Sequence, residues 1–382
     1  MSSPRHPPGL DDVDALGRDD PSGMLRVVAG SGAQIREAAA ASSEAGVQQL
    51  AAEGRPRAVV VAGIGGSGIS GDVLAAVAGP ACPVPVFVHR GYDLPMWVGA
   101  ADVVIGVSCS GSTEETLSAV EQAVHRGCAV VGVGAAESPL ADVVGRSGGI
   151  HVPVPTGRMP RASLWALSVP LLLVADALDI LNVTGPMLDA AADRLDAIAE
   201  QCRPTNESFA NPAKQLALEL AGTLPMIWGS SPLAGVAAYR LTCQLAENAK
   251  APGIAGILPE ANHNQVVVFD GPFVSLAAGD SAPADFFRDR GDDGDNARLR
   301  LVLLRDSVEH PQVARRREVS RELAESRGIE VSELLAEGDS PLERLVALIG
   351  MPDFATVYLA LLTGIDPTPI TPIVELKDRI LQ

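Results

Sequence analysis

Two stretches rich in glycine and hydroxyl side chains each follow an apolar run, and their composition suits the binding of an anion. The first, GIGGSGISGD at 63–72, satisfies G-x-G-x-x-G and follows AVVVAG. Such a loop ends a strand, turns tightly and opens a helix whose free N–H groups face an anion. The second, SCSGSTEET at 108–116, follows DVVIGVS and also leads into a predicted helix. The spacing leaves open whether the first loop holds a dinucleotide or a smaller anion.

A dinucleotide site requires an acidic side chain at the end of the second strand, about 20 residues after the glycines. The second predicted strand, VPVFVH, ends instead at His89 and Arg90, and Asp93 follows only after a Gly-Tyr turn. Because Arg90 would suit the 2′-phosphate of NADP, an NADP-dependent dehydrogenase remains an alternative.

The two loops are expected to face each other, since the carboxyl ends of neighbouring parallel strands line one crevice. Their combined N–H and hydroxyl donors favour a socket for one phosphomonoester. The groups expected to bind it belong to Gly65, Gly66, Ser67, Ser108, Ser110 and Thr113. In the alternative interpretation, the Ser and Thr side chains only cap the two helices.

Composition excludes several classes of protein. The 382 residues favour two compact units, and a formal charge of −18 argues against binding to nucleic acid, which needs concentrated Lys and Arg. The five cysteines are scattered and form no C-x-x-C, which predicts neither a disulfide framework nor a zinc site. A reducing cytoplasm fits this pattern.

No signal peptide and no membrane span are expected. Residues 1–20 are polar, and the most apolar stretch, ASLWALSVPLLLVADALDIL, is broken by Pro170 and Asp176. This stretch is predicted to form a buried helix.

The order of apolar and helical patterns predicts an α/β fold. In the first half, AVVVAG, VPVFVH, DVVIGVS, CAVVGVG and GIHVPV alternate with helical patterns, two of them starting at about Ile69 and Thr113. Buried strands separated by helices imply a parallel sheet covered on both faces.

The pattern restarts in the second half. LPMIWGSSPLAGVAAYRL repeats the order of strand, Gly/Ser loop and helix, and QVVVFD, LRLVLLRD and IEVSEL are the strands expected after it. Helices are predicted near Gln312 to Ser326, 341–350 and 353–364. We therefore expect a polar arm at 1–23, a first αβα sandwich subdomain at 24–185, and a second at 186–382 that begins with a linking helix. The acidic, turn-rich segment near 280–300 reads as a solvated loop, with a lid as the alternative.

The two loops together resemble the sugar isomerase (SIS) domain family. The resemblance extends through PRASL at 160–164, ENAK at 247–250, PEANHNQ at 259–265 and YLALLTGIDPTPITPIVELK near the C-terminus. This set resembles the archaeal and bacterial bifunctional phosphoglucose/phosphomannose isomerase family over nearly the whole chain from about Met24. It implies two tandem SIS-type subdomains and an enzyme that interconverts glucose 6-phosphate and mannose 6-phosphate with fructose 6-phosphate.

Moving a proton between C1 and C2 of a sugar phosphate through a cis-enediolate requires a carboxylate base, a cation near the oxyanion and groups that open the ring. By resemblance, Glu247 in AENAK is the base, although a solvated helix glutamate is the default for such a residue. Arg161 in PRASL is the candidate cation, with an ordinary ion pair as the alternative role. His263, in a polar cluster, suits ring opening near neutral pH. Lys377 matches a family lysine that assists ring opening.

The resemblance also implies a homodimer, because the family histidine that matches His263 reaches the neighbouring subunit's active site. One enediolate common to both aldoses would explain the dual specificity. The mechanism needs no cofactor and no metal, and the sequence lacks the His/Glu cluster of a zinc-dependent phosphomannose isomerase.

The chain departs from the family pattern at two places. Ser112 stands where the family usually has Asn, and Gln265 replaces a Glu that follows the His263 motif. The loss of that carboxylate is expected to alter the ionisation of His263 or the sugar preference. A catalytically silent, regulatory phosphosugar-binding protein remains the second hypothesis, because a fold and a socket do not guarantee turnover.

Overall fold

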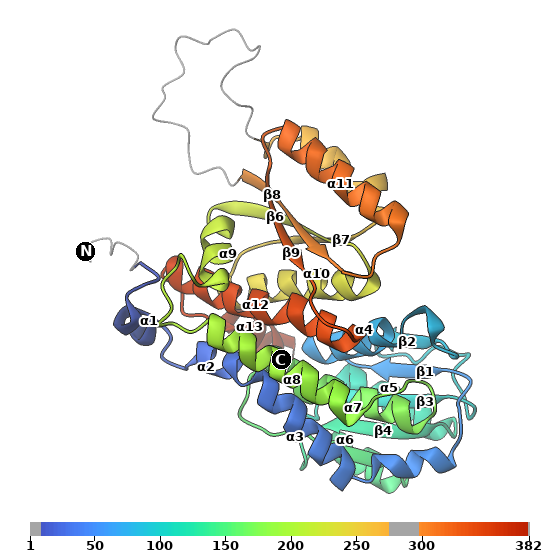
Figure 1. Cartoon of the computed structure of the whole chain (residues 1–382). Helices are drawn as coiled ribbons and strands as arrows, with labels where there is room; N and C mark the ends of the chain where they lie inside the picture. Colours follow the sequence, from blue (N-terminus) through green and yellow to red (C-terminus); the bar gives the residue numbers. More distant parts are fainter. Residues whose placement is uncertain (1–8, 275–297, 381–382) are drawn as a thin grey trace, which may run out of the picture. The chain divides into compact units, whose positions relative to one another are not determined.

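The computed structural model describes residues 9–274 and 298–380, which fold into two compact units (Figure 1). The five-stranded unit comprises Ala29–Ala197 and Gly338–Val346. Among the described residues, the four-stranded unit comprises 9–28, 198–274, 298–337 and 347–380. The predicted acidic loop at 280–300 lies almost entirely outside the described residues.

The sheet of the five-stranded unit is entirely parallel, with the strand order β2-β1-β3-β4-β5. Its strands are β1 (Val59–Ala62), β2 (Val86–His89), β3 (Val103–Ser108), β4 (Ala129–Gly134) and β5 (Ile150–Pro153). Strands β1 and β3 are buried along their whole length, which explains why they are rich in Val and Ile and show no apolar–polar alternation.

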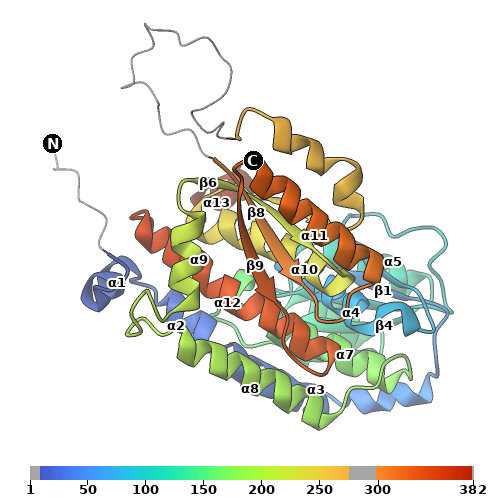
Figure 2. The same cartoon turned by 45° about the horizontal axis from the view of Figure 1, so that its top comes forward.

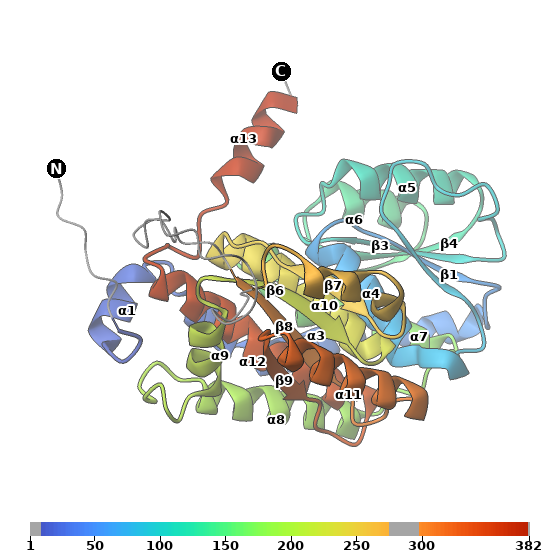
Figure 3. The same ribbon diagram turned by 90° about the horizontal axis from the view of Figure 1, so that it is seen from above.

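Helices cover this sheet on both faces, as the alternation of patterns predicted. They are α3 (Ser31–Glu44), α4 (Gly66–Ala78), α5 (Glu114–His125), α6 (Pro139–Arg146), α7 (Leu164–Ala177) and most of α8 (Gly185–Gln201), with the short helices η1 (Val47–Ala52), η2 (Gly79–Ala81) and η3 (Pro160–Ala162). Helix α7 packs on α3 and α4, and Figure 3 shows α5 and α6 on the opposite side of the sheet. The apolar stretch predicted to be a buried helix is α7.

The four-stranded unit repeats this arrangement. Its strands are β6 (Thr223–Gly229), β7 (Ile254–Ile257), β8 (Arg298–Arg305) and β9 (Glu330–Leu335). They are all parallel in the order β7-β6-β8-β9, which matches β2-β1-β3-β4 of the other sheet. The α/β fold class with two parallel sheets flanked by helices is therefore confirmed.

Helices α10 and α11 lie on opposite faces of this second sheet (Figure 2). The helices of the unit, of which α2 and α12 extend past its boundary in sequence, are α1 (Val13–Asp19), α2 (Met24–Ala29), α9 (Pro212–Leu220), α10 (Pro232–Gln244), η4 (Leu245–Ala249), η5 (Glu260–His263), η6 (Gln265–Asp270), α11 (Pro311–Ser326), α12 (Pro341–Leu362) and α13 (Thr371–Ile380). A core cluster forms where Trp228 stacks on Phe269, with ring centroids 5.5 Å apart, beside Leu301 and Leu303.

The prediction that QVVVFD forms a strand is wrong. Strand β6 is already paired on one side with β7, a strand that the sequence analysis missed, and on the other with β8. The segment is the short 3₁₀ helix η6 instead, and it begins where the Asn264 side-chain oxygen accepts the N–H of Gln265. Its contribution to the fold is Phe269, which is buried.

The two helices predicted around 341–350 and 353–364 form one continuous helix, α12. Pro352 lies inside it and removes one helical hydrogen bond, but burial of the flanking apolar residues compensates for that loss. Among the described helices α12 alone is long and apolar enough to cross a membrane, yet 83% of its most apolar window is buried inside the protein. Such burial is typical of a core helix.

Candidate active site

The two glycine and hydroxyl loops meet at the point where the first sheet reverses its strand order. Strand β1 connects through α4 to β2 on one side, and the chain then returns to β3 on the other side of β1. Such a switch point is where open parallel sheets bind ligands, outside the carboxyl ends of the strands. A Cβ placed on Gly63 would lie 3.1 Å from the carbonyl oxygen of Val107, so the two loops start in contact.

The glycines of the first loop are required by close backbone approach. Gly65 precedes α4 with φ of +60°, and a Cβ on Gly66 would lie 3.2 Å from the carbonyl oxygen of Pro160. A Cβ on Gly68 would lie only 2.8 Å from the Gly63 carbonyl oxygen. No side chain caps α4 at Gly65, and Ser67 in its first turn is buried. The backbone N–H groups at the start of this helix are thus available to an anion.

The second loop is a cluster of hydroxyl groups that bond mainly to one another. The Oγ of Ser108 lies 2.8 Å from Oγ1 of Thr113 and 3.4 Å from Oγ of Ser110. Ser112 Oγ donates to Ser110 Oγ at 3.1 Å. Thr113 is the N-cap of α5 but its side chain makes no capping bond. Helix capping, the alternative role for these side chains, is therefore not what the Thr113 hydroxyl does.

Arg161 lies beside the glycine loop. It is on η3, only 3% exposed, and its Cα is 4.0 Å from the position of a Cβ on Gly66. The same turn contacts the second loop, because Ser163 hydrogen-bonds the thiol of Cys109. Burial raises the pKa of Cys109 and this hydrogen bond offsets part of the rise, so the thiol stays protonated near neutral pH. One side of the five-stranded unit thus gathers Arg161 with all six predicted phosphate-binding residues.

Glu247 lies in the four-stranded unit, on the single π turn η4 that ends α10. Its side chain is half-buried, while Asn248 beside it is fully buried. Lys250 adopts a left-handed conformation, φ +57°, and its Nζ donates to the carbonyl oxygens of Glu247 at 2.6 Å and Pro367 at 3.3 Å. π turns are common at functional sites. Sequence reasoning assigned no role to Lys250, although a basic residue just after a helix is a recognised C-terminal signal.

His263 ends the short helix η5 and is exposed. Its neighbours hold the backbone in place: Asn262 Nδ2 donates to Ser320 Oγ at 2.7 Å, and Asn264 Nδ2 donates to Glu260 Oε1 at 2.9 Å. The polar cluster therefore fixes the turn while the imidazole faces solvent.

The departure at Gln265 has a structural role. The indole N–H of Trp228 donates to Gln265 Oε1 at 2.7 Å, and Gln265 Nε2 donates to the Ala255 carbonyl at 3.0 Å. Both ends of this amide thus bond to β6 and β7. The expected influence of Gln265 on His263 stays a prediction.

Lys377 lies on α13, a helix with no buried residue, and is itself exposed. The four-stranded unit therefore carries Glu247, His263 and Lys377 on three separate elements, and the five-stranded unit carries the phosphate loops and Arg161. The catalytic roles of these residues stay predictions.

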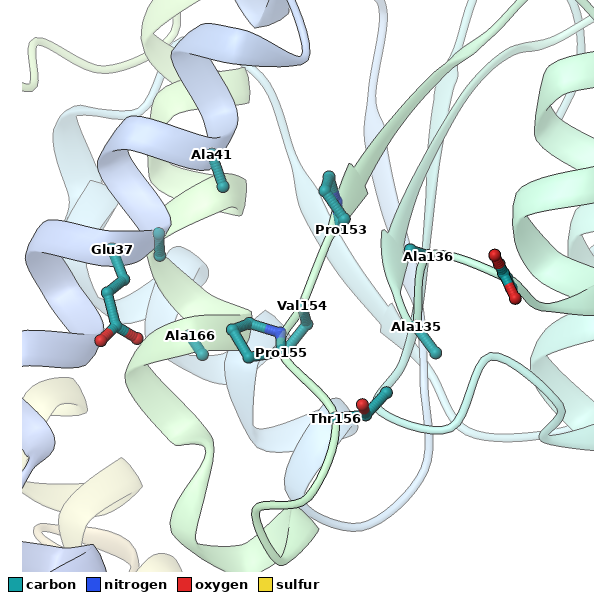
Figure 4. Close-up of a pocket in the computed structure, with 11 residues that line it drawn as sticks. Glu37, Ala41, Ala135, Ala136, Pro153, Val154, Pro155, Thr156 and Ala166 are labelled. Atoms are coloured by element: carbon teal, nitrogen blue, oxygen red, sulfur yellow. The ribbon is translucent and has the colours of Figure 1, made fainter.

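A separate hollow of about 610 Å³ lies in the five-stranded unit between α3 and the loops that follow β4 and β5 (Figure 4). Of the described residues that line it, none is a predicted site residue, and most are Ala or Pro. Its polar groups include Glu37, which accepts a bond from Arg158 at 2.8 Å, and Glu137. Carboxylates repel a phosphate, so this hollow does not suit the phosphate end of a ligand.

Comparison with known proteins agrees with this geometry. The chain is 31% identical over 324 residues to the bifunctional phosphoglucose/phosphomannose isomerase of Caldicellulosiruptor bescii. The aligned residues make up 85% of this chain and 89% of the relative. This chain belongs to the bifunctional phosphoglucose/phosphomannose isomerase family. The enzyme of the same name from Aquifex aeolicus is 29% identical, over 85% of this chain and 90% of its own.

Residues 209–380 match the bacterial phospho-glucose isomerase C-terminal SIS domain. The matched segment of this chain includes Glu247, His263 and Lys377. The structure is similar to that of a hypothetical protein from Thermus thermophilus, with a TM-score of 0.69 and 17% identity over 96% of this chain and 93% of the other. At that identity the likeness supports the fold alone.

Proposed function

We propose that this chain is an isomerase that interconverts glucose 6-phosphate and mannose 6-phosphate with fructose 6-phosphate. The observation that carries the proposal is the pair of neighbouring loops at the β1/β3 switch point. One loop offers backbone N–H groups between glycines, and the other offers a cluster of hydroxyls. Family membership supplies the reaction, and the loops supply a seat of the right chemistry for its 6-phosphate.

Phosphate binding in this proposal rests on the first turns of α4 and α5. The dianion accepts hydrogen bonds from the N–H groups near Gly66 and from the hydroxyls of Ser67, Ser108, Ser110 and Thr113. The hydroxyls bond to one another here, and rotation about their C–O bonds would let them donate to a phosphate instead. The loops thus fix one end of an open-chain sugar.

Proton transfer is assigned to Glu247. The carboxylate takes the proton from C2 of the aldose, forming the cis-enediolate, and returns it to C1 to give the ketose. Arg161 stabilises the negative charge that develops on the sugar oxygens. His263 and Lys377 assist opening of the ring. Return of the proton to either face of C2 yields glucose 6-phosphate or mannose 6-phosphate from one intermediate.

We propose further that the enzyme is a cytoplasmic homodimer in which His263 of one copy serves the site of the other. The exposure of His263 supports this part of the proposal, since a side chain that acts in a partner's site must be accessible at the surface of its own subunit. The free state of the five cysteines suits a reducing compartment.

Purified protein given fructose 6-phosphate, with a chelator present, tests the function. Formation of both aldose 6-phosphates is expected. Binding of the phosphosugar without any product would favour the regulatory phosphosugar-binding alternative, and activity that disappears on chelation would contradict the metal-free mechanism. Light scattering of the same sample would show a dimer, and a monomer with full activity would overturn the shared-site arrangement.

A further inference from the structure

Three polar side chains spaced by four residues point from α10 and η4 to α12 within the four-stranded unit. Arg240 and Gln244 both bond to Asp353: Arg240 Nη2 donates at 2.6 Å, Arg240 Nε at 3.0 Å and Gln244 Nε2 at 3.3 Å. Asn248 Nδ2 donates to Thr356 Oγ1 at 3.0 Å, one helical turn further along. The two helices are thus joined by a continuous row of hydrogen bonds.

This row is buried over its whole length. The exposed fractions are 3% for Arg240, 2% for Gln244, 4% for Asp353, and zero for Asn248 and Thr356. Buried polar groups must keep their hydrogen-bond partners, because water cannot replace them. The row therefore fixes how α10 and η4 are rotated about their own helix axis relative to α12.

The π turn makes the last member of the row possible. In an unbroken α-helix each step of four residues turns about 40° beyond a full turn, so the third residue of such a series drifts away from the contact face. In a π turn each residue turns less. Asn248 consequently stays on the face toward Thr356, and Glu247, the residue before it, emerges beside the contact as a half-buried side chain.

We propose that the Asn248–Thr356 hydrogen bond is a positioning contact that aims the carboxylate of Glu247. This inference rests on the proposed function, in which Glu247 is the base. Thr356 Oγ1 also donates to the Asp353 carbonyl at 2.9 Å, so the acceptor itself has a fixed orientation. Lys250 holds the Glu247 carbonyl from the other side. The backbone around the base is thereby held at the Glu247 carbonyl and through the side chain of the next residue, Asn248.

Thr356→Val tests the proposal, because it keeps the shape of the side chain and removes the hydroxyl, which accepts from Asn248 and donates to the Asp353 carbonyl. We expect kcat to fall about 10- to 100-fold with KM within about twofold, since a misplaced base affects the reaction more than binding. The acidic limb of the pH profile of kcat/KM is expected to shift as well. Thr356→Ser, which restores the hydroxyl, should recover most of the rate.

Thr363→Val is the matched control. Thr363 lies directly after α12, and its hydroxyl donates only to the carbonyls of Leu359 and Ala360 at the end of that helix, so its loss should change kcat less than twofold. Thermal melting would first show that both valine variants are folded. Equal kcat and equal pH profiles for the two variants would then overturn the positioning role. Absence of activity in the unchanged protein would instead contradict the proposed function, so the two failures are distinguishable.

Discussion

The loops that follow β1 and β6 occupy the same place in two similar sheets, yet their chemistry is opposite. After β1, helix α4 opens at Gly65 and Gly66 without a side-chain cap. After β6, helix α10 opens at Ser231 and Pro232, and Ser231 Oγ accepts the N–H of Ala234 at 3.2 Å. One helix start leaves its donors available, and the other uses its own side chain to satisfy them.

The loop after β6 is also closed by a carboxylate of the protein itself. Asp306 follows β8, the strand that pairs with β6 as β3 pairs with β1, and is 2% exposed. Its Oδ2 accepts the hydroxyl of Ser231 at 2.7 Å, and its N–H donates to Ser230 Oγ at 2.9 Å. Pro232 has no N–H where Gly66 has one. A few residues thus decide whether the start of such a helix leaves its N–H donors available or satisfies them within the protein.

Glu247→Gln is expected to have the largest effect, because it removes the proposed base in the four-stranded unit and leaves the phosphate loops of the five-stranded unit unchanged. Loss of the general base should lower kcat by about 10²- to 10⁴-fold while leaving phosphosugar affinity nearly unchanged. Steady-state kinetics and calorimetric binding of fructose 6-phosphate measure the two quantities. The control is Glu325→Gln on α11, an exposed helix glutamate. Near wild-type turnover in Glu247→Gln would mean that another group is the base.

Ser110→Leu should come next, since it places an apolar side chain in the hydroxyl cluster of the first unit. Loss of a hydrogen bond to a dianion predicts roughly 10- to 100-fold weaker binding of every sugar 6-phosphate alike. Calorimetry with glucose, mannose and fructose 6-phosphates would measure this. If one sugar lost affinity and another did not, Ser110 would contact the sugar rather than the phosphate.

Ser231→Ala makes the opposite prediction for the loop after β6. The variant removes the cap of α10 and the hydroxyl that bonds to Asp306, so the free energy of unfolding should fall by about 1–3 kcal/mol. Phosphosugar affinity should not change. Urea unfolding followed by a binding titration checks both, and an affinity change without a stability change would show that this loop also takes part in binding.

The smallest effect concerns pH and the first sheet. Burial alone would raise the pKa of Asp102, but the bonds from Arg57, at 2.9 Å from Nε, and from the N–H of Gly99 leave it below the ordinary value of 3.8. A lowered pKa contributes stability that is complete above pH 3.8 and is lost as pH falls below that value. Asp102→Asn should therefore destabilise the protein at about pH 6 more than at about pH 3. A constant difference in unfolding midpoint would contradict this assignment.

Much of this architecture was predictable because local chemistry and fold agree. Runs of Val and Ile indicated the buried strands, and the facing of the two loops followed from the rule for neighbouring parallel strands. The position of Arg161 beside Gly66 was not predictable from spacing, since the two residues are far apart in the chain, and the family resemblance suggested only that Arg161 belongs to the site. QVVVFD was misread because its three valines have high strand propensity, whereas the Asn264 cap and the burial of Phe269 against Trp228 hold the segment as a 3₁₀ helix.

The π turn at η4 limits the number of residues that this segment can have, in addition to their identity. A π turn is equivalent to an α-helix with one extra residue, so a single deletion between 244 and 249 would restore a regular helix. That deletion would retain most side chains but rotate the start of ENAK relative to α12. Sequence change in this segment is therefore constrained in two ways: by which residues are present and by how many there are. Substitutions here can be gradual, but a change of length has to be compensated nearby.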